Sequence, residues 1–205
     1  MPSFVDPHWN PIYATAQELD LPINFHIGFA EIDLDKMSAS GIEARRTDVA
    51  ELEGSAAALR LAKLLMGQTD WIGKLLMSGV CERYPRLTFV AVETGFGHLP
   101  FYLETLDWQV KGHGSKGLPL LPSEYFRRQC YGTFWFESLS LPLLKHYPDN
   151  FMFSTDYPHP TSLSPGPCGP TDLMPSEYVA QKYVDLDPAL AKKVLSENAA
   201  AVYKL

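Results

Sequence analysis

The stretch RLTFVAVETG, residues 86–95, decides the fold class of this 205-residue chain. Its β-branched and aromatic residues form a short apolar run, which is typical of a buried strand, and Glu93 and Gly95 follow that run at once. One helical pattern precedes the run in residues 70–84, and another follows it in residues 98–110. A strand between two helices is typical of a parallel sheet with helices packed on it.

Three more apolar runs of this kind predict further strands, at residues 21–28, 130–138 and 150–154. Helical patterns lie between and after them, at residues 11–20, 54–66 and 139–147 and from Ser176 onwards, and a proline-rich irregular loop is expected at residues 157–175. No linker or repeat divides the chain, so we expect a single α/β domain over residues 1–205. Four parallel strands fit either a small open sheet or half of a (β/α)₈ barrel, which typically takes about 250 residues.

The composition excludes several classes of protein. Hydrophobic residues make up 46% and charged residues 20%, as in globular proteins, and the net charge of −7 with scattered Lys and Arg argues against a nucleic-acid partner. No apolar run approaches the roughly 18 residues of a membrane span. The start of the chain has no signal-peptide pattern, and its three cysteines, Cys81, Cys130 and Cys168, are far apart. We therefore expect a cytoplasmic protein with reduced thiols and no membrane partner.

Polar residues cluster at the carboxyl ends of the predicted strands: His26, Glu93, Glu137 and Asp156. Ligands bind at that edge in parallel α/β folds, and His and Asp are ligand types that suit zinc and similar divalent ions. Each residue also has a structural explanation. His26 is also compatible with a histidine satisfied inside the core, Glu93 with a helix cap, and Asp156 with a turn before Tyr-Pro.

Other charged residues leave similar alternatives open. Glu137, near a strand end, is a candidate pocket-lining residue. His159, between two prolines, points either into the site or to the surface. Arg127 and Arg128 are interpreted as a solvated basic pair. There is no Gly-rich phosphate loop and no Gly-x-Ser-x-Gly nucleophile motif. The residues by themselves thus predict an α/β protein with a candidate His/Asp metal site.

Four motifs in order extend this prediction: DPHWNPIYATAQELDLPINFHIG (6–28), ERYPRLTFVAVETGFGHLPFYLETLD (82–107), NFMFSTDYPHP (150–160) and VLSENAAAVYKL (194–205). Their sequence and order resemble the amidohydrolase-related family, which includes aminocarboxymuconate-semialdehyde decarboxylase and γ-resorcylate decarboxylase. The resemblance covers essentially the whole chain. It implies a (β/α)₈ barrel and a metal-dependent hydrolase or non-oxidative decarboxylase that acts on a small carboxylate-bearing or aromatic compound.

The resemblance also implies roles for individual residues. His26 takes the place of a metal-ligand histidine at the end of strand five, and Asp156 that of the strand-eight aspartate, which binds the metal or activates its water. The expected cofactor is a divalent metal, zinc in the first place, with manganese or iron as alternatives. Glu93 stands near the position of the acid/base histidine of the decarboxylases, and a glutamate whose pKa is raised by burial can also move protons. Asp156 and Glu93 are therefore the candidate catalytic residues.

One departure from the family is large. The family begins with a His-x-His pair at the end of strand one, and no two histidines of this chain are two residues apart. We therefore expect the chain to correspond to the C-terminal half of a family member, strands five to eight, to bind metal weakly and to turn over little substrate by itself. A different expectation is a non-catalytic remnant or assembly partner that pairs with a separate N-terminal half. The exposed sheet edges of a half barrel also suggest that the chain forms a homo-oligomer.

Overall fold

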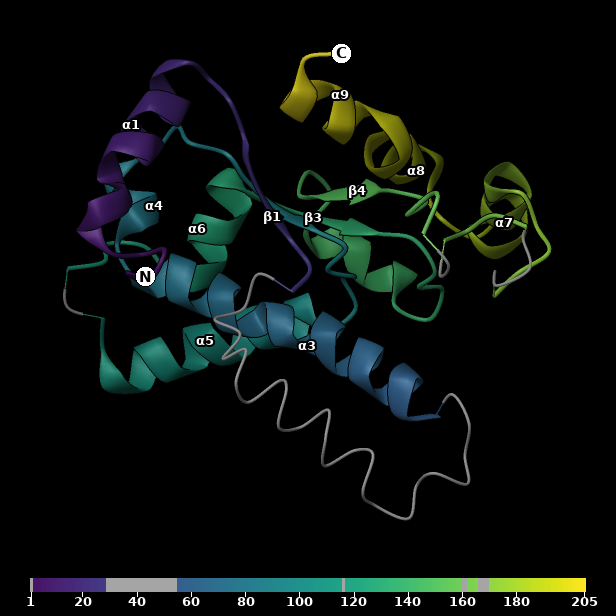
Figure 1. Ribbon diagram of the computed structural model, residues 1–205, viewed down its shortest axis with the longest axis horizontal. Helices are drawn as coiled ribbons and strands as arrows, with labels where there is room; N and C mark the ends of the chain where they lie inside the picture. The colour runs from purple at the N-terminus through teal and green to yellow at the C-terminus, as the bar shows by residue number, and fades with distance from the viewer. Residues whose placement is uncertain (1, 29–54, 116, 160–161, 166–169) are drawn as a thin grey trace.

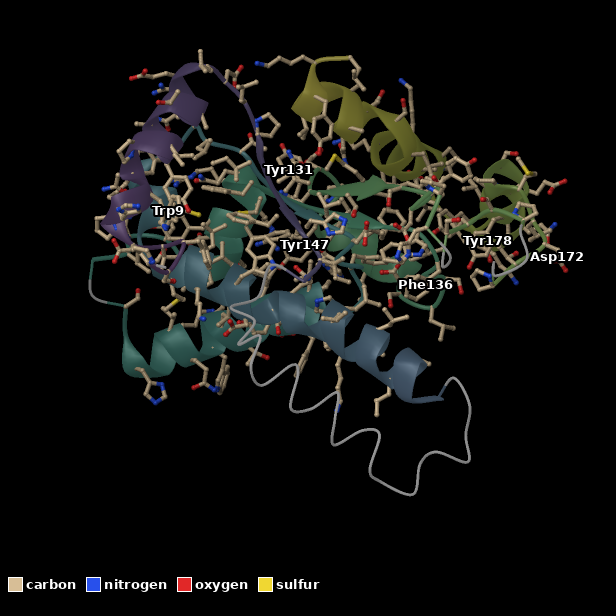
Figure 2. All side chains as sticks on the ribbon, viewed as in Figure 1. Trp9, Tyr131, Phe136, Tyr147, Asp172 and Tyr178 are labelled. Carbon is tan, nitrogen blue, oxygen red and sulfur yellow. The ribbon has the colours of Figure 1, made fainter. Side chains whose placement is uncertain are left out.

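One parallel sheet organises the protein (Figure 1). The computed structural model describes residues 2–28, 55–115, 117–159, 162–165 and 170–205. In that part of the chain, four parallel strands lie in the order β1-β2-β3-β4: Ile23–His26, Phe89–Val92, Cys130–Phe134 and Phe151–Phe153. All four predicted strands are confirmed, each shorter than its apolar run. The predicted α/β class is also confirmed, because a helix lies between each pair of neighbouring strands.

The helices lie on both sides of this sheet in Figure 1, with α3 and α5 on one side and α9 on the other. The α-helices are α1 (Asn10–Glu18), α3 (Ser55–Met77), α4 (Val80–Arg83), α5 (Leu99–His113), α6 (Pro122–Gln129), α7 (Pro175–Lys182), α8 (Pro188–Lys192) and α9 (Asn198–Tyr203). The described residues also form two 3₁₀ segments, η1 (Pro7–Trp9) and η3 (Leu141–His146), and a π-helical turn, η4 (Lys193–Glu197). Among the described residues, every helix is too short or too polar to span a bilayer.

The two faces of the sheet bury different residues, because side chains alternate along a strand. One face holds aromatic residues such as Phe25, Phe89 and Phe151, which belong to the main core beneath the helices. The opposite face holds Val90 and Met152, which pack with Val202 of α9 in a second, smaller cluster. The sheet is therefore covered on both faces.

The C-terminal segment spans the second face from β4 to β1. Asn198 donates hydrogen bonds to the carbonyls of Pro148 (2.9 Å) and Phe151 (2.8 Å), at the start of β4. At the other end, the hydroxyl of Tyr203 donates to Oδ1 of Asn24 on β1 over 2.7 Å. These contacts lie near the amino ends of the strands, so α9 leaves their carboxyl ends free for a site.

The predicted helix boundaries around residue 67 were wrong. The two patterns at 54–66 and 70–84 form one continuous helix, α3, which ends at Met77, and the short α4 follows. The residues between the two patterns interrupt the apolar period but do not break a helix. The break comes at Gly79, whose φ of 78° is left-handed and favours glycine.

Helix α6 was not predicted. Arg127 and Arg128 on this helix are exposed, as expected for a solvated basic pair, and they also contact neighbouring elements. The N-terminus of α6 has a capping-box hydrogen bond, in which Glu124 accepts from the backbone N–H of Leu121 over 2.7 Å. The guanidinium of Arg127 lies 4.4 Å above the ring of Tyr147. Arg128 donates to the carbonyl of Cys81 over 2.7 Å. Both arginines therefore join α6 to neighbouring elements.

Candidate active site

A cavity of 830 Å³ lies at the carboxyl ends of the strands. The three residues predicted as metal ligands or catalytic groups, His26, Glu93 and Asp156, all line it, and so does His159. His26 ends β1, Glu93 directly follows β2, and Asp156 lies three residues after β4; parallel strands present their carboxyl ends at one edge of the sheet. The structure thus brings the three predicted residues together, while their chemical roles stay predictions.

The apolar wall of the cavity comes from two parts of the chain. Leu61, Leu64 and Leu65 extend from the N-terminal half of α3, and Trp135, Phe136 and Tyr157 follow β3 and β4. A cavity of this size with a few convergent polar groups is typical of small-molecule sites.

His26 and Glu93 form a close polar contact in the cavity. Nε2 of His26 lies 2.7 Å from Oε1 of Glu93, and Nδ1 lies 3.0 Å from the carbonyl oxygen of Ile27. A carbonyl only accepts, so Nδ1 carries a hydrogen, and Nε2 is the ring nitrogen that faces Glu93. The bond to Ile27 raises the pKa of His26, and the Glu93 carboxylate adds to that rise.

Glu93 is a carboxyl group suited to hold a proton. Burial raises its pKa, and the neighbouring Asp156 carboxylate raises it further, while His26 opposes the rise. Two carboxyl groups close together disfavour a second negative charge, so a proton is retained more readily on one of them. Glu93 and His26 are therefore a carboxyl–imidazole pair in direct contact at the cavity.

Asp156 and His159 form a second pair at the end of β4. Nδ1 of His159 lies 3.2 Å from Oδ2 of Asp156, whose side chain is only 5% exposed. The backbone N–H of His159 also donates to the carbonyl of Asp156 over 2.8 Å, which closes a turn. The turn and site interpretations of Asp156 are thus compatible. For His159, the structure places the ring at the cavity, where the sequence left two positions open.

Glu137, the fourth polar residue near a strand end, does not line this cavity. Its Oε1 accepts from the N–H of Phe96 (2.8 Å) and its Oε2 from the N–H of Trp135 (3.1 Å). Strand β3 ends at Phe134, so Glu137 lies three residues beyond it and turns back toward the protein.

Two side chains of the cavity are suitable donors for a divalent metal. No group of three or more His, Cys, Asp or Glu side chains within those residues has an arrangement that holds a metal ion. His26 offers Nε2, with its Nδ1–H oriented by a backbone carbonyl as in many metal sites, and Asp156 offers a carboxylate. Zinc sites usually have three or four protein donors, so these two do not make a complete site.

Solved structures similar to this chain are larger proteins. An amidohydrolase from Mycobacterium avium subsp. paratuberculosis K-10 superposes with a TM-score of 0.70 at 20% identity, over 98% of this chain and 46% of the other. A 5-carboxyvanillate decarboxylase from Sphingomonas paucimobilis gives a TM-score of 0.65 at 20% identity, over 100% and 55% of the two chains. A dihydroxybenzoic acid decarboxylase from Polaromonas sp. JS666, with bound manganese and the inhibitor 2-nitroresorcinol, gives 0.65 at 20% identity, over 98% and 55%.

These similarities show the fold, and this chain spans about half the length of the structures it matches. The predicted partial (β/α)₈ barrel of four strands is thereby confirmed. No curated protein sequence is significantly similar to the chain. The family model described as amidohydrolase, however, matches residues 1–205. The chain therefore belongs to the amidohydrolase family.

Proposed function

We propose that this chain carries the acid/base part of an amidohydrolase-type active site that acts on a small aromatic or carboxylate-bearing compound, by hydrolysis or by non-oxidative decarboxylation. The observation that carries the proposal is the 2.7 Å contact between Nε2 of His26 and Oε1 of Glu93 in a cavity shared with Asp156. The catalytic residues are Glu93 and Asp156. Both reaction types need a proton donor and a proton acceptor near the reacting atom, and Glu93 and Asp156 supply them.

Glu93 serves as the general acid in this proposal. Loss of CO₂ leaves an electron pair on a ring carbon, which must then gain a proton; hydrolysis requires a proton for its leaving group. Because burial raises the pKa of Glu93, its carboxyl group keeps a proton available at the cavity. While Nε2 of His26 holds no metal, it orients the Glu93 carboxyl group through the 2.7 Å contact.

The walls of the cavity favour a flat, apolar substrate. Three leucines of α3 line the cavity together with Trp135 and Phe136, so an aromatic ring bound there is removed from water. Two of the similar structures are named as decarboxylases of aromatic acids, which supports the same substrate class. Removal of water also strengthens the electrostatic interaction between Glu93 and the bound compound.

A divalent metal belongs to the proposal as well, because the dihydroxybenzoic acid decarboxylase contains manganese. Nε2 of His26 and the carboxylate of Asp156 would hold it, zinc being the first choice, together with donors from outside the described residues. Such an ion lowers the pKa of a bound water toward about 7. The two donors present fill only part of its coordination.

Activity assays with matched variants test the proposal. CO₂ release from hydroxybenzoates and hydrolysis of lactones and amides are compared for this chain and for a longer polypeptide that adds a His-x-His segment. The longer polypeptide is expected to be active in one assay, and Glu93→Gln is expected to lower that activity by about 10²-fold or more. Glu124→Gln, at the start of α6, is the control and keeps wild-type activity. Equal activity of the E93Q and wild-type proteins would overturn the assignment of Glu93.

A second function, that of a non-catalytic assembly partner, is favoured by one observation: the chain spans about half of each matched structure. The genomic sequence upstream of the Met1 codon separates the two. An in-frame His-x-His segment supports the enzyme, and an in-frame stop supports the assembly partner. Self-association through the edges of β1 and β4, which pair with no further strand in the described part of the chain, stays a prediction, as does a cytoplasmic location. Light scattering and cell fractionation test them.

A further inference from the structure

We propose that Glu137 is a positioning residue that holds the loop carrying Glu93 against the Trp135–Phe136 wall of the cavity. The inference rests on the proposed function only in calling Glu93 catalytic. The contacts themselves stand independently of any activity. They join the loop after β2 (residues 93–98) to the loop after β3 (residues 135–140).

The carboxylate of Glu137 reaches both loops at once. Oε1 accepts a hydrogen bond from the N–H of Phe96 over 2.8 Å, across 41 positions of sequence, and Oε2 accepts from the N–H of Trp135 over 3.1 Å. Burial raises the pKa of Glu137, and the surrounding backbone N–H groups, those of Phe96 and Trp135 among them, oppose that rise. Hydrogen bonds from N–H groups to a carboxylate are stronger than those to a neutral acceptor. A single side chain thus fixes the distance between the two loops.

Glycines allow these loops to come so close. A Cβ placed on Gly95 would lie 2.6 Å from Oε1 of Glu137, and the backbone there has a φ of 70°, which also favours glycine. A Cβ on Gly97 would collide with Oγ of Ser140 in the same way. The sequence ETGFG therefore provides the room that the Glu137 carboxylate occupies.

The wall segment is itself anchored on its other side. The hydroxyl of Tyr183 donates to the carbonyl of Trp135, and that of Tyr178 on α7 donates to the carbonyl of Phe136, each over 2.8 Å. Because these two carbonyls are fixed, the neighbouring Glu137 carboxylate has a fixed base from which to hold the loop.

The start of the Glu93 loop is held by Thr133 of β3. The N–H of Glu93 donates to Oγ1 of Thr133 over 2.8 Å, and the N–H of Gly95 donates to the Thr133 carbonyl over 3.0 Å. Glu137 extends the same attachment to Phe96. Without it, the loop keeps its first two bonds to β3 and loses the third, so the left-handed turn at Glu93 becomes free to relax.

Nuclear magnetic resonance of the 22.9 kDa chain tests the inference without requiring catalysis. In Glu137→Ala, hydrogen exchange of the Phe96 amide is expected to accelerate by about tenfold or more. The amide signals of Glu93 and Trp135 are expected to move as well. Glu137→Gln keeps one carbonyl oxygen as an acceptor and is expected to restore the Phe96 bond in part, which provides a folded variant if Glu137→Ala does not fold.

The control is Glu124→Ala, which removes another carboxylate that accepts a backbone N–H, at the start of α6. It is expected to change the Leu121 amide and to leave the Glu93 amide unchanged. An unchanged Glu93 amide signal in both Glu137 variants would overturn the inference. If the signals move while every preparation lacks activity, the proposed function fails and the positioning role of Glu137 holds.

Discussion

Glu93 and Asp156 share an uncommon backbone conformation: both have a left-handed φ, 56° and 59°, where β2 and β4 end. Both carboxyl groups line the cavity, and the Asp156 carboxylate adds to the rise that burial causes in the pKa of Glu93. Residues other than glycine adopt this conformation at a cost, and such residues cluster at functional sites. The two strand ends are thus shaped to turn these carboxyl groups into one cavity.

The first prediction measures the cost of that conformation at Glu93. Glu93→Gly and Glu93→Ala both remove the carboxyl group, but only glycine adopts a positive φ freely. We expect the Gly variant to have the higher free energy of unfolding, by about 1 kcal/mol. Urea denaturation of the two variants measures this difference. At Glu104, inside helix α5, the same pair of substitutions is expected to give the opposite order, with Ala more stable. The same order at both positions would contradict the prediction.

The second prediction concerns Thr133, which fixes the backbone of Glu93. Thr133→Val keeps the shape of the side chain and removes the hydroxyl that accepts the 2.8 Å bond from Glu93 N–H. We expect a loss of about 1 kcal/mol in the free energy of unfolding and a changed Glu93 amide signal. Thr105→Val on α5, where the hydroxyl donates to the carbonyl of Phe101, is the matched control and leaves the Glu93 amide unchanged. An unshifted Glu93 amide in Thr133→Val would show that this bond does not hold the residue.

The third prediction concerns the pH dependence of stability. Burial lowers the pKa of His98 below 6.5, and its Nε2 has no hydrogen-bond partner among the described residues. The unfolded chain then binds more protons than the folded one as the pH falls through about 6.5. The His98 contribution to stability is therefore fully present above pH 6.5 and is lost progressively toward the lower folded pKa.

Urea denaturation between pH 5 and pH 8 measures this effect. We expect the wild-type protein to lose stability relative to His98→Gln as the pH falls below about 6.5, by about 1.4 kcal/mol for each unit of pKa difference. Above pH 7.5 the difference between the two proteins is expected to be constant. A difference that stays constant down to pH 5 would contradict the burial of an uncharged His98.

Much of the fold follows from local patterns in the sequence. The four strands are short, β-branched and aromatic, and are bounded by Pro, Gly or polar residues, so each was predicted at its place. Helix α6 was missed because two arginines interrupt its apolar pattern. They are held by Tyr147 and by the Cys81 carbonyl, partners that are distant in the sequence. The helix break at Gly79 was missed because it depends on the left-handed backbone conformation of that residue.

The sequence predicted which residues belong to the site and that they lie at the carboxyl edge of the sheet, but it did not predict their contacts. Parallel strands align their carboxyl ends, which is why His26, Glu93 and Asp156 were expected near one another. The orientation of His159 toward Asp156 was left open because it depends on the turn that follows β4. The role of Glu137 was not foreseen, since it depends on a close approach between two loops 41 residues apart. The sequence signal for this role is the pair of glycines in ETGFG after one strand, together with a glutamate, Glu137, after the next strand.

Metal titration tests the central claim, that this chain carries one part of an amidohydrolase site, most directly. His26 and Asp156 offer two donors, and the described residues hold no group of three. Isothermal titration with zinc and with manganese is expected to give weak binding that His26→Ala or Asp156→Asn weakens further. Tight, stoichiometric binding by this chain alone would contradict the account, and so would binding that neither substitution changes.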